Sequence, residues 1–129
     1  MIMIEESYVS FDTAKLLKEA GFDVPCFIQY TERGTIWHCD CPENFNESQC
    51  ATSCPTQALA ARWLREVHRI SVDAAFMAPS TNIDVWQYFI GKMDDMIWPG
   101  DFETSERTYA TYEEAFEEGL KRGLELIKK

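Results

Sequence analysis

The sequence has no long apolar run and no recognisable export signal. No segment approaches the roughly 18 uncharged apolar residues that a membrane-spanning helix needs. The first ten residues, MIMIEESYVS, contain neither a basic stretch nor a long apolar core, so they do not look like a signal peptide. We therefore predict no association with a membrane and a cytoplasmic location.

Positive charge is also scarce. The chain has 12 Lys and Arg against 22 Asp and Glu, which gives a formal net charge of −10. A domain this acidic repels phosphate backbones unless it carries a local basic face, so nucleic-acid binding is disfavoured. The same charge would suit a protein that imitates nucleic acid, although in most small acidic domains it mainly maintains solubility.

The familiar catalytic and nucleotide-binding motifs are missing. The sequence contains no G-x-x-x-x-G-K-[ST], no G-x-G-x-x-G and no H-E-x-x-H. His38 and His68 are not part of any local cysteine-protease signature. The acidic segment 94–103 lacks the alternation of an EF-hand loop, which favours a solvated loop over a cation site. We therefore predict that the chain is not an enzyme.

The residues that are present suit one packed domain. The chain has 129 residues, of which 46% are hydrophobic and 13% aromatic, enough for a sizeable core. No internal repeat and no Gly/Ser/Pro-rich linker divides it. We therefore predict a single domain over residues 1–129.

Three segments have the apolar spacing of amphipathic helices: SFDTAKLLKEAGF, PTQALAARWLREVHRI and TYEEAFEEGLKRGLELIKK. Suitable capping residues begin each of them: Ser10 or Asp12, Thr56, and Thr111 with Glu114. Gly119 and Gly123 lie beside the apolar stripe of the last helix, where they lower helix propensity. Close packing against a sheet or another helix would explain them.

Two pairs of segments read as β-hairpins. Cys26–Tyr30 and Thr35–Cys39 flank the turn residues TERG, and ISVDAAFM and DVWQYFIGKM flank APSTNI. The predicted order is helix, hairpin, helix, hairpin, helix. We expect an α+β fold of two layers, with an antiparallel sheet of about four strands and the helices packed on one face.

Four of the five cysteines lie within sixteen residues, at Cys39, Cys41, Cys50 and Cys54. Four thiolates can hold Zn(II) in a closed structural site, so these residues are candidate ligands of a structural zinc ion. The spacings C-x-C and C-x-x-x-C are less regular than the usual C-x-x-C. Reduced thiols packed as small hydrophobes and, after export or oxidation, disulfides are the other interpretations. Cys26 lies alone in a predicted strand and is expected in the core.

Three arginines form the candidate interaction residues. Arg62, Arg65 and Arg69 recur opposite the apolar side of the middle helix. Such a stripe would suit phosphate or an acidic partner. On a chain of this charge the arginines would otherwise pair with its own carboxylates.

Three blocks, FDTAKLLKEAGF, PTQALAARWLREVH and TYEEAFEEGLKRGLELI, carry a resemblance over nearly the whole chain. They resemble uncharacterised small proteins of gut Bacteroidales, their phages and mobile elements, most specifically through P-T-Q-x-L and W-L-R-E-x-H. The resemblance implies an intracellular origin and a phage-type accessory role, and it supplies no activity and no catalytic residue. Members of this group do not all carry the cysteine quartet, which argues against an obligatory zinc site.

These observations favour a non-enzymatic interaction domain that binds a protein or a second copy of itself. The alternative is a zinc-stabilised module that contacts nucleic acid, or an enzyme acting on it, through Arg62, Arg65 and Arg69. A thiol-dependent enzyme is the weakest of the three hypotheses, because a nucleophile and its base must meet in space.

Overall fold

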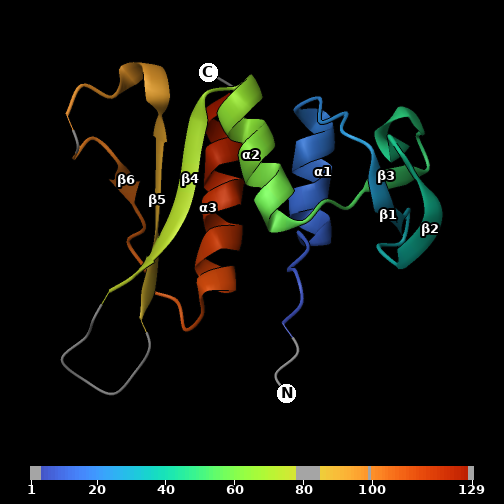
Figure 1. The fold of residues 1–129 in the computed structure, drawn as a ribbon, viewed down its shortest axis with the longest axis horizontal. Helices are drawn as coiled ribbons and strands as arrows, with labels where there is room; N and C mark the ends of the chain where they lie inside the picture. Colours follow the sequence, from blue (N-terminus) through green and yellow to red (C-terminus); the bar gives the residue numbers. More distant parts are fainter. Residues whose placement is uncertain (1–3, 78–84, 99, 128–129) are drawn as a thin grey trace. The chain divides into compact units, whose positions relative to one another are not determined.

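The computed structural model describes residues 4–77, 85–98 and 100–127. The chain forms two compact units, Met1–Ala60 and Ala61–Lys129. Helices and antiparallel strands confirm the predicted α+β class (Figure 1). One sheet of about four strands is not confirmed, because the strands form two separate three-stranded sheets. That residues 1–129 act as one domain stays a prediction.

The first unit contains one complete helix and a small sheet. Its elements are α1 (Phe11–Glu19), β1 (Cys26–Thr31), β2 (Ile36–Glu43), the 3-10 helix η1 (Phe45–Glu47) and β3 (Ala51–Ser53). The sheet has the order β2-β1-β3, and both pairings are antiparallel. Ser10 caps α1 by accepting a hydrogen bond from the Thr13 backbone N–H, as predicted. Gly21 follows the helix with φ +96°, a conformation that glycine adopts without strain.

The first predicted hairpin is confirmed, but the segment after it is more ordered than the sequence suggests. Gly34 adopts φ +83° in the turn, and Tyr30 pairs with Ile36. The strand predicted to end at Cys39 continues to Glu43, and β3 lies inside the segment that reads as an irregular cysteine loop. A three-residue strand has no periodic signal of its own, so its pairing with β1 defines it.

Side chains of β1 alternate between core and surface. Cys26, Ile28 and Tyr30 are buried, whereas Phe27 is 55% exposed. The Tyr30 hydroxyl donates a 2.7 Å hydrogen bond to the Val9 carbonyl, which satisfies the polar end of a buried ring. One face of β1 therefore belongs to the core and the other does not.

The second unit holds the larger sheet and the longest helix. Its elements are most of α2 (Gln57–Val67), then β4 (Ile70–Phe76), β5 (Trp86–Lys92), η2 (Met93–Asp95), β6 (Glu103–Thr104) and α3 (Tyr112–Ile127). The sheet order is β4-β5-β6, again antiparallel. The second predicted hairpin is thus confirmed in its strands, and its turn, residues 78–83, lies outside the described residues.

Helix α3 covers one face of the β4–β5 pair (Figure 1). A Cβ atom on Gly119 would lie 2.9 Å from Tyr88 Cβ, and one on Gly123 would lie 3.0 Å from Val72 Cγ2. The two glycines therefore permit a close approach of helix and sheet, as predicted. At the start of α3 the Glu114 N–H donates to Thr111 Oγ1 over 3.1 Å, which confirms Thr111 as the cap.

Helix α2 begins as predicted but ends differently. The Leu59 N–H donates to Thr56 Oγ1 over 3.1 Å, so Thr56 is the cap. Trp63 and Leu64 are buried, whereas Val67, which follows them at helical spacing, is 59% exposed. Val67 is the last residue of the helix, where the apolar stripe runs past the core. In the described segments, no helix has the length and hydrophobicity needed to cross a bilayer.

Candidate interaction surface

Strand β2 and the outer face of β1 expose large apolar side chains. Trp37 is 60% exposed and Ile36 49%, and every β2 residue except Cys39 is exposed. The pairing of Gln29 with Trp37, and the 3.3 Å hydrogen bond from Gln29 Nε2 to Cys39 Sγ, place these side chains on one face of the sheet. Phe27 lies on this face by strand alternation. Ile36 pairs with the buried Tyr30 and lies on the other face. We call Phe27, Trp37, Cys39 and the outer edge of β2 the β2 surface.

The opposite edge of the same sheet is covered. The Ser53 backbone N–H on β3 donates a 2.8 Å hydrogen bond to Asn46 Oδ1. Lys18 Nζ donates to the carbonyl of Ala51 over 2.6 Å and to that of Ser48 over 2.6 Å. Side chains from η1 and α1 thus take the place of a further strand, which is how many proteins prevent unwanted edge pairing.

The outer edge of β2 has no such cover. The Thr31 N–H donates to the Thr35 carbonyl over 2.8 Å, so Trp37, two residues further on, also bonds inward to β1. Because hydrogen bonding alternates along an antiparallel strand, the backbone groups of Ile36 and His38 point outward, and the register shifts after the pair Ile28–His38. Among the described strands, none pairs with this outer edge of β2.

The cysteines predicted to bind zinc fall at two different edges of this sheet. Cys39 and Cys41 lie on β2, Cys50 lies in the exposed segment before β3, and Cys54 is buried just after β3. Because β1 separates β2 from β3, the two outer strands lie about 10 Å apart. No three metal-binding side chains gather in the described part of the chain. The structural zinc site stays a prediction that this arrangement does not assemble.

Two of the five thiols are held in the core. Cys54 Sγ donates to the Val9 carbonyl over 3.7 Å. Burial, and next the neighbouring Cys54 thiol, raise the pKa of Cys26 to about 11. Cys26 therefore lies in the core, as predicted, and its thiol is protonated at neutral pH.

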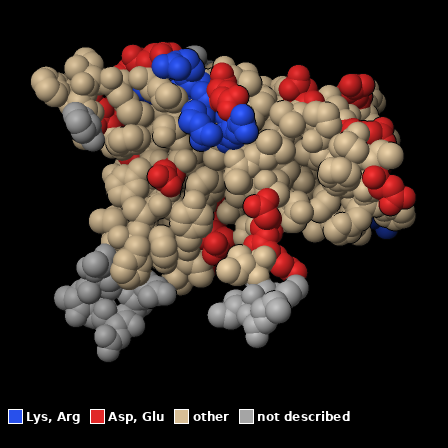
Figure 2. Space-filling model, viewed as in Figure 1, with Lys and Arg blue, Asp and Glu red and all other residues tan. Residues whose placement is uncertain are grey.

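The three candidate arginines do not form one stripe. Arg62 pairs with Glu66 one turn along α2, and Arg65 is exposed on the same helix. Arg69 lies beyond the end of α2 with φ 54° and pairs with Asp94 over 2.7 Å. Figure 2 shows basic side chains gathered over the upper end of α2 and β4, with acidic side chains directly beside them. For Arg62 and Arg69 the structure therefore shows pairing with the chain's own carboxylates.

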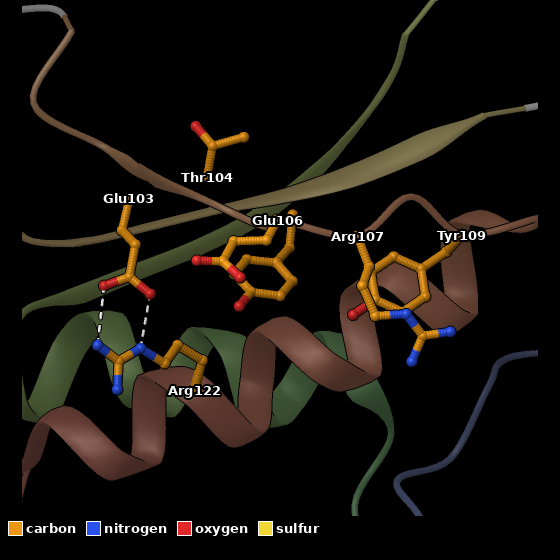
Figure 3. A pocket seen from close by; sticks show the side chains of 7 residues that line it. Glu103, Thr104, Glu106, Arg107, Tyr109 and Arg122 are labelled. Carbon is orange, nitrogen blue, oxygen red and sulfur yellow. Dashed lines mark hydrogen bonds and ion pairs between the residues drawn. The ribbon is translucent and has the colours of Figure 1, made fainter.

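A polar cavity of about 510 Å³ lies in the second unit, beside β6 and α3 (Figure 3). Its lining consists of charged and phenolic residues: Tyr88, Glu103, Thr104, Glu106, Arg107, Tyr109 and Arg122. Arg122 donates two hydrogen bonds to Glu103, over 2.6 and 3.0 Å, and this fork fixes both side chains. The Arg107 guanidinium lies 5.4 Å from the Tyr109 ring centre, a cation–π distance.

The surroundings of this cavity shift the pKa values of Tyr88, Tyr109 and Glu103. Burial raises the pKa values of Tyr88 and Tyr109, so both remain neutral phenols at physiological pH. The hydrogen bond from Arg122 lowers the pKa of Glu103 and keeps that carboxylate ionised. Among the lining residues, no nucleophile is paired with a base. The cavity has room for a small polar molecule.

Sequence reasoning missed both of these places. Glu103 and Arg122 lie 19 residues apart, so no local spacing joins them. For Phe27 and Trp37 there was a signal, because each alternates with predicted inward residues of its strand. Alternation shows that a side chain leaves the core, but only the fold shows whether another element covers it.

Comparison with protein-family models, with curated proteins and with solved structures finds no match to this chain.

Proposed function

We propose that this chain is a non-enzymatic protein-interaction domain that binds its partner through the β2 surface. The observation that carries the proposal is the exposure of Phe27 and Trp37, 55% and 60%, on one face of a sheet whose edge strand β2 has no described strand on its outer side. Single exposed hydrophobic residues are common on protein surfaces. Two aromatic side chains beside a row of unused backbone groups form a more specific feature.

The chemistry of this surface suits recognition of a protein. An exposed edge offers backbone donors and acceptors to an added strand, and neighbouring side chains supply specificity. Aromatic residues, tryptophan above all, contribute much of the binding energy in protein interfaces. The β2 surface combines both features.

The location, the accessory role and the zinc module rest on the sequence alone. The cytoplasmic location and the phage-type accessory role remain predictions from the sequence. The zinc-stabilised nucleic-acid module also remains a prediction. Its arginines are dispersed, and Arg62 and Arg69 are already paired with carboxylates.

A matched pair of tryptophan variants tests the proposal. Proteins that bind the tagged wild-type chain would be identified, and their affinities measured by calorimetry with Trp37→Ala and Trp98→Ala. Trp98, 71% exposed in the second unit, is the control. We expect Trp37→Ala to weaken binding about 30-fold, as loss of a central aromatic anchor does. Equal affinities of the wild type and Trp37→Ala would overturn the proposal.

A further inference from the structure

The polar cavity of the second unit contains one cation and one carboxylate that no described residue neutralises. The guanidinium of Arg107 and the carboxylate of Glu106 take part in no ion pair or hydrogen bond among the described residues. We propose that this cavity binds a small zwitterion, whose carboxylate contacts Arg107 and whose ammonium group contacts Glu106. A free amino acid and a dipeptide both carry that pair of charges. The site shares no residue with the β2 surface, so this inference goes beyond the proposed function.

The backbone that carries these two charges is held to β5 on both sides. The Ser105 N–H donates to the Tyr88 carbonyl over 3.1 Å, and the Tyr88 N–H donates to Ser105 Oγ over 3.3 Å. Tyr109 and Trp86 exchange two backbone hydrogen bonds, of 2.8 and 2.9 Å. Ser105 Oγ also donates to the Arg107 carbonyl over 2.8 Å. The backbone between these anchors is therefore ordered before a ligand arrives, which lowers the entropy cost of binding.

The other two charged side chains of the cavity neutralise each other. Arg122 donates two hydrogen bonds to Glu103, so neither of them offers a free charge to a ligand (Figure 3). The side chains of Glu106 and Arg107 extend in different directions, and Arg107 lies across Tyr109 (Figure 3). The cavity thus presents one free negative group and one free positive group at separate places.

This charge balance favours a zwitterion over an ion of one sign. The lining holds two glutamates and two arginines, so its formal charges sum to zero. A simple anion would be attracted by Arg107 but repelled by Glu106 and by a chain of net charge −10. A simple cation would be attracted by Glu106 but repelled by Arg107. A ligand with both charges satisfies both groups and adds no net charge.

Two phenol groups supply further hydrogen bonds. The rings of Tyr88 and Tyr109 lie 6.5 Å apart with an angle of 29° between their planes. Neither hydroxyl has a partner among the described residues, and each can donate as well as accept. Burial raises the pKa of both phenols, so they stay protonated and add no charge. The volume of about 510 Å³ lies within the roughly 300–1,000 Å³ of small-molecule sites.

The first test is an NMR titration of the full chain with the common amino acids and, separately, with a set of dipeptides. The Arg107 side-chain N–H and the Tyr109 backbone N–H report binding, and the two arms show which source supplies the ligand. The strongest probe is then compared with its N-acetyl derivative, which lacks the ammonium charge, and with its C-terminal amide, which lacks the carboxylate. We expect the zwitterion to bind about tenfold more tightly than either analogue, because each analogue loses a contact with a charged group.

Single variants then assign each end of the ligand. Arg107→Gln should weaken binding of the zwitterion about tenfold without weakening binding of the C-terminal amide. Glu106→Gln should do the same without weakening binding of the N-acetyl derivative. The matched controls are Glu32→Gln and Arg33→Gln, which change the same Glu-Arg dipeptide in the turn between β1 and β2. These four positions are exposed, so the variants should remain folded.

Three results would overturn this inference. The first is that no amino acid or dipeptide shifts the reporter signals of the wild-type chain. The second is that the zwitterion binds no more tightly than its two analogues. The third is that Arg107→Gln and Glu106→Gln change its affinity no more than the two control variants do. None of these results affects the proposed function, which is tested by the dependence of protein binding on Trp37.

Discussion

The two three-stranded sheets of this protein differ in how other elements cover them. In the second unit, α3 covers one face, and Arg122 of that helix holds the edge strand β6 through Glu103. In the first unit, β2 is exposed along its length, and Phe27 and Trp37 extend from the outer face. The cover of α3 and the ion pair between β6 and α3 thus distinguish the second sheet from the first, where Phe27 and Trp37 leave one face exposed. Coverage, and not hydrophobicity alone, decides which apolar side chains remain available for binding.

The contrast repeats at the two edges of the first sheet. Polar side chains of Asn46 and Lys18 take the outer hydrogen-bonding positions beside β3, while β2 has none in the described part of the chain. An exposed edge offers backbone groups with which another strand can pair, and a covered edge does not. In an experiment on one of these two edges, the other edge can therefore serve as the control.

The largest expected effect is a loss of stability when a buried side chain of α3 is shortened. Leu120 of α3 is fully buried, and Leu120→Ala should lower the free energy of unfolding by about 2–5 kcal/mol, since it leaves a cavity. Trp37→Ala removes a larger side chain but should change the free energy of unfolding by only about 0.5 kcal/mol. Urea denaturation at low protein concentration measures both. If Trp37→Ala lowered the free energy of unfolding as much as Leu120→Ala, the Trp37 side chain would be packed and not exposed.

A smaller loss of stability is expected when the side chain that covers the β3 edge is removed. Asn46 Oδ1 accepts from the Ser53 N–H over 2.8 Å, and its Nδ2 donates to the Phe22 carbonyl over 2.9 Å. Asn46→Ala leaves both groups without these partners and should cost about 1–3 kcal/mol. Hydrogen exchange at the Ser53 amide should also accelerate.

The aspartate variant is the control for this edge. Asn46→Asp keeps an oxygen acceptor beside Ser53, so its amide should stay protected although the bond to Phe22 is lost. Unchanged exchange at Ser53 in Asn46→Ala would mean that the Asn46 side chain does not cover the β3 edge.

The sequence predicted the parts of the fold that have a regular spacing of apolar residues or a helix-capping residue. The three helices, their caps at Ser10, Thr56 and Thr111, and the strands of both hairpins follow from local spacing. Even the packing role of Gly119 and Gly123 was predictable, because two glycines in a helix interior need a compensating contact.

The missed parts depend on contacts between distant segments. Strand β3 is three residues long and exists through its pairing with β1. The cysteines looked like one cluster because they are close in sequence, yet β1 lies between the strands that carry or precede them. The β2 surface was missed for a related reason: aromatic side chains in a strand favour burial on average, and only the absence of a covering element in the described structure makes Trp37 a surface residue.

The smallest expected effect concerns the ion pair that ties β6 to α3. Arg122 lowers the pKa of Glu103 in the folded chain, chiefly through its hydrogen bond, so the pair stabilises the fold above the unfolded-state pKa of Glu, about 4.3. This contribution is lost as the pH falls through the lower folded-state value. Both side chains are about two-fifths exposed, at 39% and 42%, so solvent screens the pair. At pH 7, Glu103→Gln should lower the free energy of unfolding by about 0.2–1 kcal/mol. The difference from wild type should shrink in 1 M salt and disappear once acid protonates Glu103. Urea denaturation across pH measures it, and a loss of several kcal/mol at pH 7 would show that this ion pair, more than the apolar contact of Leu120, closes the second sheet.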